Sequence, residues 1–461
     1  MAYSATQEPS LFAGTGQAII FVVYDDARTG NSKFRYICDV YINGTASANK
    51  VARLKQLPNA QSRGVFDISK IVNSYLYPTT VNQGSTTTPI HLLPKDDIGD
   101  PFSQNDSSLE SVVCKFGVEF STSATTAPTV SADEFTEDVV YCIQGSIPYF
   151  SSPQGGNYDF AEFIPDGTSK RFLTNMPDYT IDGQTISVSN DEWRTMSFLN
   201  DSADCELNRL YVQIFNSSGS KLNTSNDYFE NTNANGGANP SSEVNTDAER
   251  LIFVGVGVKN LNIQNLHTDM RISSHATASY YEVFGANGSG TQKTTKYRFS
   301  LDGNDCKYPM KQLAWKNRFG QWDYFTFKKK DEKNLSITRT SMEKPIGDFN
   351  SLAYSENSFR RGTETLTTNA TYQQTVNSDY LTELQAEWME GLFTSNDVYL
   401  INTESDIFNK NCGQTISADN PDVLPVVITS AEYKKKTSVN DKCQIQYTLT
   451  YNYSHKQRVA I

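Results

Sequence analysis

The sequence has little of what an enzyme or a metalloprotein needs. It contains four histidines, and none belongs to an HExxH or HxH pattern that would place two metal ligands together. The nucleophile elbow GxSxG, the phosphate loop GxxxxGK[ST] and a GxGxxG fingerprint after a strand are also absent. We therefore predict no catalytic residue, no cofactor and no metal. The histidines are His91, His267, His275 and His455.

Long hydrophobic runs and paired cysteines are missing as well. The longest apolar runs, Ala18–Tyr24 and Leu251–Val258, are far shorter than the roughly 20 residues that span a bilayer. The N-terminus lacks the basic and apolar parts of a signal peptide. No two of the 7 cysteines form a CxxC, and Cys38 and Cys443 lie on the apolar side of alternating segments. We expect folding in a reducing cytoplasm, buried thiols and no membrane span.

The charge balance disfavours a dedicated nucleic-acid-binding protein. The net charge is −12, and charged residues make up 20% of the chain, below the roughly 25% of an average globular protein. Two basic runs, 328–330 and 434–436, follow strand-like segments and suit solvated turns or charged edges better than a phosphate site. The acidic clusters at 96–100 and 302–305 lack EF-hand spacing and are read as turns.

Strand patterns dominate what is present. From Cys443 to Tyr453, the apolar residues Cys443, Ile445, Tyr447, Leu449, Tyr451 and Tyr453 alternate with Gln, Thr and Asn. A period of two indicates a β-strand with one buried face. Aromatic residues reach 12% of the chain, with 25 Tyr and 25 Phe, which also favours strands.

The first region, 1–145, is predicted to be a β-rich domain with one short helix. Strands are expected at Ala18–Asp25 and Phe34–Ile42, and Asn43-Gly44 predicts a hairpin turn because both residues tolerate positive φ. Apolar residues at helical spacing follow Asp67, a candidate N-cap, as far as Leu76. Further strands are expected at 109–120 and 138–142, with an exposed loop at 81–88.

The remaining chain is divided into a middle region, 146–290, and a last region, 291–461, both β-rich. The middle region holds a long polar segment, Asn216–Asn245, read as a mobile insertion or as a piece that orders against a neighbour. The last region holds a second helix, Asp379–Phe393, which Ser378 could cap. The predicted fold is therefore mainly β, with several β-sandwich-like modules and a few short helices. Other predicted strands are 185–188, 194–199, 207–215, 251–258, 278–284, 296–301, 398–401 and 423–434.

The aromatic segment Trp315–Phe327 is the best candidate for a contact surface. It reads as two strands around a turn that contains Gly320. Trp315, Trp322 and Tyr324 could contact a glycan or another subunit if exposed. The alternative, which we favour, is that these rings fill a β-sandwich core.

In overall composition and strand-rich pattern, the chain resembles the virion structural proteins of tailed bacteriophages, above all tail, baseplate and neck components. The resemblance rests on Val22–Leu76, Trp315–Phe327 and Val423–Tyr453, and no residue role follows from it. It implies a non-enzymatic subunit that assembles in the host cytoplasm, as symmetric copies of itself and with other virion proteins. One alternative is a carbohydrate- or receptor-binding protein that recognises a host surface glycan. A polysaccharide-degrading enzyme is another, because two carboxylates suffice for that chemistry.

Overall fold

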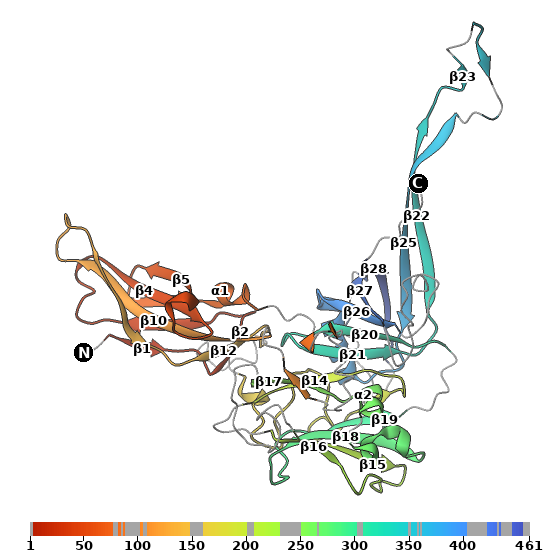
Figure 1. Ribbon diagram of the computed structural model, residues 1–461, viewed down its shortest axis with the longest axis horizontal. Helices are drawn as coiled ribbons and strands as arrows, with labels where there is room; N and C mark the ends of the chain where they lie inside the picture. Colours follow the sequence, from red (N-terminus) through yellow and green to blue (C-terminus); the bar gives the residue numbers. More distant parts are fainter. Residues whose placement is uncertain are drawn as a thin grey trace. The chain divides into compact units, whose positions relative to one another are not determined.

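The protein is described by a computed structural model, whose elements are drawn in Figure 1. Contacts divide the chain into two compact units, Met1–Asn304 with Lys316–Tyr324, and Asp305–Trp315 with Phe325–Ile461. The division into 1–145, 146–290 and 291–461 stays a prediction. The described residues are 3–76, 82–83, 86–87, 102–104, 108–147, 160–200, 207–230, 250–264, 267–301, 308–348, 352–356, 359, 362–402, 422–430, 433–434 and 445–454.

The first unit begins with two sheets that enclose one core. One sheet has the order β1-β3-β6 and the other β2-β12-β10-β4-β5, with β11 paired to β10. Inward side chains of both sheets share a hydrophobic cluster, in which the Phe116 ring lies 5.5 Å from that of Phe21 and 5.9 Å from that of Phe66. Two sheets packed face to face are the sandwich that the sequence predicts. The strands are β1 (Ser4–Gln7), β2 (Phe12–Gly14), β3 (Ile20–Tyr24), β4 (Ser32–Ile42), β5 (Lys50–Gln56), β6 (Arg63–Asp67), β10 (Leu109–Ser121), β11 (Thr129–Thr136) and β12 (Val140–Ile143).

In this part of the chain, the predicted turn at Asn43-Gly44 is confirmed, whereas the predicted N-cap of the helix is wrong. Asn43 and Gly44 adopt φ values of 57° and 109° after β4, as the hairpin signal predicts. Helix α1 spans only Ser69–Asn73, and its N-cap is Ile68 rather than Asp67. The Asp67 carboxylate instead accepts hydrogen bonds from the amides of Ser69 and Ile19, which ties the turn to β3.

The rest of the first unit contains a five-stranded and a three-stranded sheet. Their orders are β13-β19-β18-β15-β16 and β14-β17-β9. The strand expected at 251–258 ends at Gly255, and helix α2 (Val258–Ile263) begins after Gly257. The strands are β9 (Phe102–Gln104), β13 (Thr185–Val188), β14 (Thr195–Leu199), β15 (Arg209–Asn216), β16 (Tyr228–Glu230), β17 (Leu251–Gly255), β18 (Ala278–Ala286) and β19 (Tyr297–Leu301).

The polar segment Asn216–Asn245 is not wholly a surface insertion. Its first part, Asn216–Glu230, folds back on β15 and ends in β16. Asn223 is fully buried, accepting a hydrogen bond from the Ile214 amide and donating to the Val212 carbonyl. The amide side chain thus replaces strand pairing, which a reading of polarity alone misses. Residues 231–245 lie outside the described residues, as do both acidic clusters, His91, His455 and Cys443.

The second unit is a large antiparallel sheet with one helix. Six strands lie in the order β20-β26-β27-β28-β25-β22. β20 (Lys311–Lys316) continues through a turn into β21 (Trp322–Phe327). Lys316–Tyr324, which comprises this turn and the adjoining strand ends, belongs to the first unit. The other strands are β22 (Glu332–Glu343), β25 (Thr363–Asn377), β26 (Val398–Asn402), β27 (Asp422–Ile428) and β28 (Thr448–Tyr453).

Helix α3 (Glu383–Thr394) starts four residues later than predicted. Thr382 forms a capping box with Gln385. Ser378, the predicted cap, instead accepts a hydrogen bond from the Tyr447 amide. The alternation of the last segment is confirmed from Ile445 onward, since Ile445, Tyr447, Leu449 and Tyr451 are buried.

The mainly β fold is confirmed. No helix among the described residues is long and apolar enough to span a membrane. The short elements are β7 (Asn82–Gln83), β8 (Thr86–Thr87), β23 (Gly347–Asp348), β24 (Ser355–Glu356), and the 3-10 turns at Ser47–Asn49, Ala161–Phe163, Thr268–Met270 and Ile272–Ser274.

Candidate functional site

A long two-stranded ribbon extends from the sheet of the second unit. β22 and β25 pair antiparallel from Glu332↔Thr375 to Glu343↔Thr363, whereas β28 pairs with β25 only from Gln373 onward. Among the described residues, Thr363–Tyr372 therefore pairs with β22 alone (Figure 1). At about 3.3 Å per residue, this free part is about 30 Å long. We call Leu335–Glu343 with Thr363–Tyr372 the ribbon.

The two faces of the ribbon differ sharply in chemistry. Side chains alternate between faces, and directly paired residues share a face. Leu335 pairs with Tyr372 and Ile337 with Ala370, which makes one face apolar. Leu366 follows on β25 as the residue that a β-bulge leaves without a partner in the pairing. The opposite face is uncharged and polar up to the β-bulge between Thr340 and Ser341, and beyond the bulge it carries the pair Met342 and Glu364. Its uncharged polar side chains are Asn334, Ser336, Thr338, Thr340, Thr367, Asn369, Thr371 and Gln373.

The large aliphatic side chains of the apolar face are partly open to solvent, whereas Ala370 between them is buried. Leu335 and Ile337 are each 43% exposed, and Leu366 is 56% exposed. At its base, the Lys333 ammonium lies 4.8 Å from the centre of the Tyr372 ring, a cation–π contact. Aliphatic side chains gathered on one face of an exposed ribbon are typical of a contact surface.

The described residues between β22 and β25, which we call the tip of the ribbon, include several exposed large side chains. Ile346, Leu352, Tyr354 and Phe359 are all exposed. The Tyr354 hydroxyl donates a 2.7 Å hydrogen bond to Glu356, and this bond raises the pKa of the tyrosine. The tip therefore extends the apolar character of the ribbon beyond its paired part.

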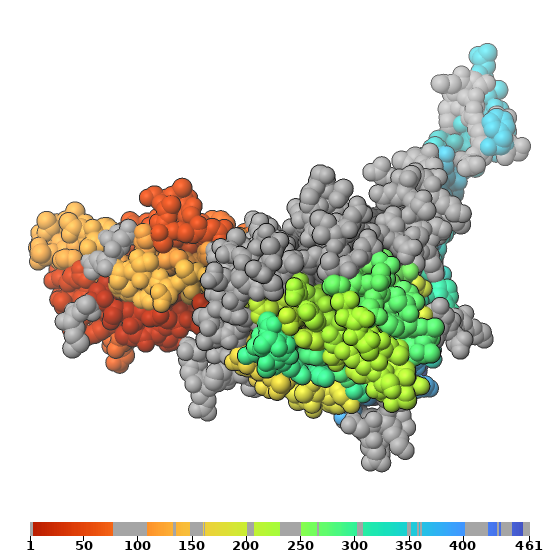
Figure 2. Space-filling view, turned by 60° about the horizontal axis from the view of Figure 1, so that its bottom comes forward, coloured from red at the N-terminus to blue at the C-terminus, as the bar shows by residue number. Residues whose placement is uncertain are grey.

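A second surface lies on the five-stranded sheet of the first unit. Alternate residues of β15 and β18, such as Val212 and Val283, are buried on one side. The other side carries aromatic rings in paired positions, of which Tyr211 and Tyr228 are half-buried and Phe284 is buried. Tyr211 stacks on Phe284 at 4.9 Å and lies 5.3 Å from Tyr228. The yellow-green strands β15 and β16 and the green strand β18 contribute to the surface in Figure 2. Tyr and Phe gathered on one sheet face suit a recognition surface.

A buried carboxylate organises the charged part of this face. The side chain of Glu282 is only 5% exposed, and it accepts hydrogen bonds from Arg298 at 2.9 Å and Lys296 at 3.3 Å. The Arg298 guanidinium carbon lies 3.3 Å from the centre of the Tyr179 ring and 4.6 Å from that of Tyr280. Arg298 is thus held by an ion pair and by two rings, which gives this part of the face a rigid geometry.

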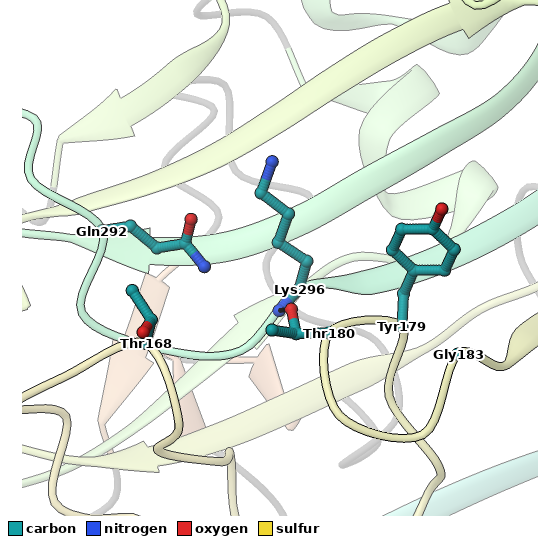
Figure 3. Close-up of a pocket in the computed structure, with 6 residues that line it drawn as sticks. All are labelled: Thr168, Tyr179, Thr180, Gly183, Gln292 and Lys296. Atoms are coloured by element: carbon teal, nitrogen blue, oxygen red, sulfur yellow. Dashed lines mark hydrogen bonds between the residues drawn. The ribbon is translucent and has the colours of Figure 1, made fainter.

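A hollow of about 600 Å³ opens beside this network, lined by Thr168, Tyr179, Thr180, Gly183, Gln292 and Lys296. Figure 3 shows the Lys296 side chain extending between Gln292 and Tyr179. The Lys296 amide donates to the Thr180 hydroxyl at 2.8 Å, and Gln292 donates to the Thr294 carbonyl at 2.7 Å. The lining offers hydroxyl, amide and ammonium groups beside an aromatic ring, which suits binding of a polar ligand rather than nucleophilic catalysis.

The structure buries the three aromatic residues singled out from the sequence. Trp315 and Tyr324 are fully buried, and Trp322 is 7% exposed. In the second unit, the Trp315 ring lies 5.3 Å from that of Trp388 on α3. In the first unit, the Tyr324 hydroxyl lies 2.6 Å from the Thr195 hydroxyl. The positions agree with the core interpretation, and a glycan could reach these rings only after neighbouring residues moved.

Other sequence candidates are scattered rather than gathered into a site. Among the described residues, no group of three His, Cys, Asp or Glu side chains could hold a metal. His275 pairs with Asp269 at 3.6 Å, within two adjoining turns. Cys38, Cys114 and Cys142 are buried free thiols, and burial raises the pKa of Cys142.

The first basic run is engaged in ion pairs. Lys330 pairs with Glu332 at 2.8 Å and Lys329 with Asp379 at 3.3 Å. Lys328 is 8% exposed. Of the second run, only Lys434 lies within the described residues.

The ribbon was not among the predicted strands, although the sequence contains a signal for it. Leu335 and Ile337 alternate with Asn, Ser and Thr, and so do Ala370 and Tyr372 in the partner strand. This period-two pattern predicts strands, but it contains few apolar residues and is weaker than the pattern of the aromatic segments.

No protein-family model matches this sequence, and a search of the curated proteins finds no match.

Proposed function

We propose that this protein is a non-enzymatic structural subunit of a bacteriophage virion, in the tail, baseplate or neck, and that it acts through subunit interfaces. The observation that carries the proposal is the ribbon. Its apolar face and tip are exposed, although the same chain buries apolar residues efficiently elsewhere. A protein that acts in solution as a monomer gains nothing from such a surface, whereas a subunit can cover it on assembly.

Several further features support a role in assembly. The aromatic face of the five-stranded sheet offers Tyr and Arg, the residue types enriched at protein interfaces. The sequence texture resembles tailed-phage structural proteins, for which assembly in the host cytoplasm is expected.

The proposal is tested on purified tailed particles. Quantitative mass spectrometry should find this chain at a fixed copy number per particle, and antibodies against it should label the tail or neck in electron micrographs. Particles from a phage that lacks the gene serve as the control. Absence of the chain from intact particles would contradict the proposal.

A second candidate function is binding of a host surface glycan at the hollow. The observation that favours it is the Tyr179 ring held on Arg298 beside the Thr168, Gln292 and Lys296 side chains. Sugars bind through hydrogen bonds to hydroxyls and through contact with aromatic rings.

A glycan array tests this candidate. Binding should weaken at least tenfold in Tyr179→Ala and persist in Tyr228→Ala, which removes a ring on the same sheet outside the hollow. Equal loss in both variants, or no bound glycan, would remove this candidate.

A further inference from the structure

We propose that the apolar face of the ribbon packs against the same face of a second copy of this chain. The inference rests on the proposed function, because it names the partner that the ribbon meets. In a two-fold symmetric contact, the same surface of each copy packs against its partner, so two identical apolar faces can cover each other.

The free ribbon needs a covering layer to be stable. Between Thr363 and Tyr372 it has β22 as its only strand partner among the described residues. An isolated two-stranded hairpin is at best marginally stable in water, and strands become stable when a hydrophobic face is packed. Leu335, Ile337 and Leu366 provide such a face.

The distribution of side chains selects a face-to-face contact. Leu335, Ile337 and Tyr372 stand on one side of the ribbon, while the other side carries mainly hydroxyl and amide groups, to which water can hydrogen-bond. Two sheets pack at about 10 Å through their apolar faces and leave the polar faces in solvent. The two-sided chemistry therefore fits a second apolar ribbon better than addition of a strand at an edge, which would cover neither face.

The charge of the ribbon does not oppose contact between identical copies. The whole chain has a net charge of −12, so copies of it repel each other over most of their surface. The ribbon is nearly neutral, because its charged residues are Arg339, Glu343 and Glu364. Arg339 and Glu343 lie on the apolar face with opposite charges, so this face has no net charge of its own. It is a part of the chain on which like copies can approach without electrostatic cost.

Cross-linking of neighbouring positions tests the inference on the full chain. Ile337→Cys places a thiol on the apolar face, and Thr338→Cys places one on the polar face a single residue away. With a short bismaleimide at micromolar protein, Ile337→Cys should form at least ten times more covalent dimer than Thr338→Cys or the wild-type chain. The wild type sets the background from the natural cysteines. Equal yields from the two variants would overturn the inference.

A second measurement does not depend on cysteine geometry. Sedimentation analysis should show self-association of the wild-type chain. Ile337→Thr, which keeps the β-branched side chain, should weaken this association at least tenfold. Thr338→Ser should leave it unchanged, and circular dichroism checks that both variants fold. A wild-type chain that stays monomeric throughout the micromolar range would overturn the inference.

The outcomes separate this inference from the proposed function. A chain found in particles, but neither associating in solution nor cross-linked through position 337, overturns the inference and leaves the structural role standing. A chain that cross-links through position 337 but is absent from virions overturns the structural role and leaves the ribbon contact standing.

Discussion

Replacing Glu137 with Gln should stabilise the N-terminal sandwich at pH 8 and change little at pH 5. Burial, followed by the charge and hydrogen bond of Glu8, raises the pKa of Glu137 from 4.5 to about 7. Glu137 lies between β11 and β12, where its amide donates to the Cys114 carbonyl at 3.0 Å. Gln can replace the protonated acid as a hydrogen-bond donor to Glu8 but cannot ionise.

The sign of the effect follows from proton binding. The folded state holds this proton more tightly than the unfolded state, so the free energy of unfolding falls as the pH rises from about 4.5 through 7 and stays lower above that. A tenfold change in a protonation equilibrium is worth about 1.4 kcal/mol, which sets an upper limit of about 3 kcal/mol. Glu8 is exposed, and solvent and salt screen its charge. We therefore expect Glu137→Gln to gain about 1 kcal/mol at pH 8.

Urea unfolding of the wild type and the variant at pH 5 and pH 8 measures this difference. Comparison at the same pH cancels the titration of all other groups. Glu162→Gln, which neutralises an exposed carboxylate in the same unit, is the matched control. A gain that is equal at both pH values, or that Glu162→Gln reproduces, would refute the reasoning.

Substitutions at three sites, the core of the N-terminal sandwich, the N-cap of α3 and a glycine within α3, test the packing inside each unit. Phe116→Ala should lower the free energy of unfolding by about 3–5 kcal/mol, because Phe116 is fully buried. Leu57→Ala, at a 65% exposed position, should change it by less than about 0.5 kcal/mol. Similar urea midpoints for both variants would contradict the core assignment. Thr382→Ala should cost about 1 kcal/mol and speed amide exchange in the first turn of α3; unchanged exchange would argue against the capping box. Gly391→Ala should destabilise the second unit despite the better helix propensity of Ala, because the new methyl would lie 2.9 Å from the Trp315 indole nitrogen. Tryptophan fluorescence on heating measures this last effect, and a raised midpoint would show that the ring moves aside freely.

Local patterns predicted individual elements well where the cause was local. The Asn43-Gly44 turn follows from the φ values that these two residues tolerate. Helix starts were less predictable, because Ser378 and Thr382 are both chemically able to cap α3. The backbone amide of Tyr447, which directly precedes β28 and is distant in the sequence, donates a hydrogen bond to Ser378, and Thr382 caps the helix instead.

The sequence does not show which surfaces stay exposed in the folded chain. From the sequence, Trp315, Trp322 and Tyr324 could form either a contact surface or part of a core. In the folded chain, neighbouring residues bury all three. The hollow joins Thr168 and Tyr179 to Gln292 and Lys296, which are far apart in the sequence. No local pattern predicts such a meeting, because it depends on the parallel pairing of β13 with β19.

The sequence by itself determined that the protein is mainly β and, for the predicted strands, which side chains share a face, because that alternation is a property of the extended backbone. The tertiary structure decided which faces are covered. Tyr451 and Ile337 both stand in alternating strands, yet Tyr451 is fully buried and Ile337 is 43% exposed. The difference arises because burial depends on what packs against a face, and those contacts come from residues distant in the sequence. The exposed ribbon, and with it the proposed subunit contact, therefore became visible only in the folded chain.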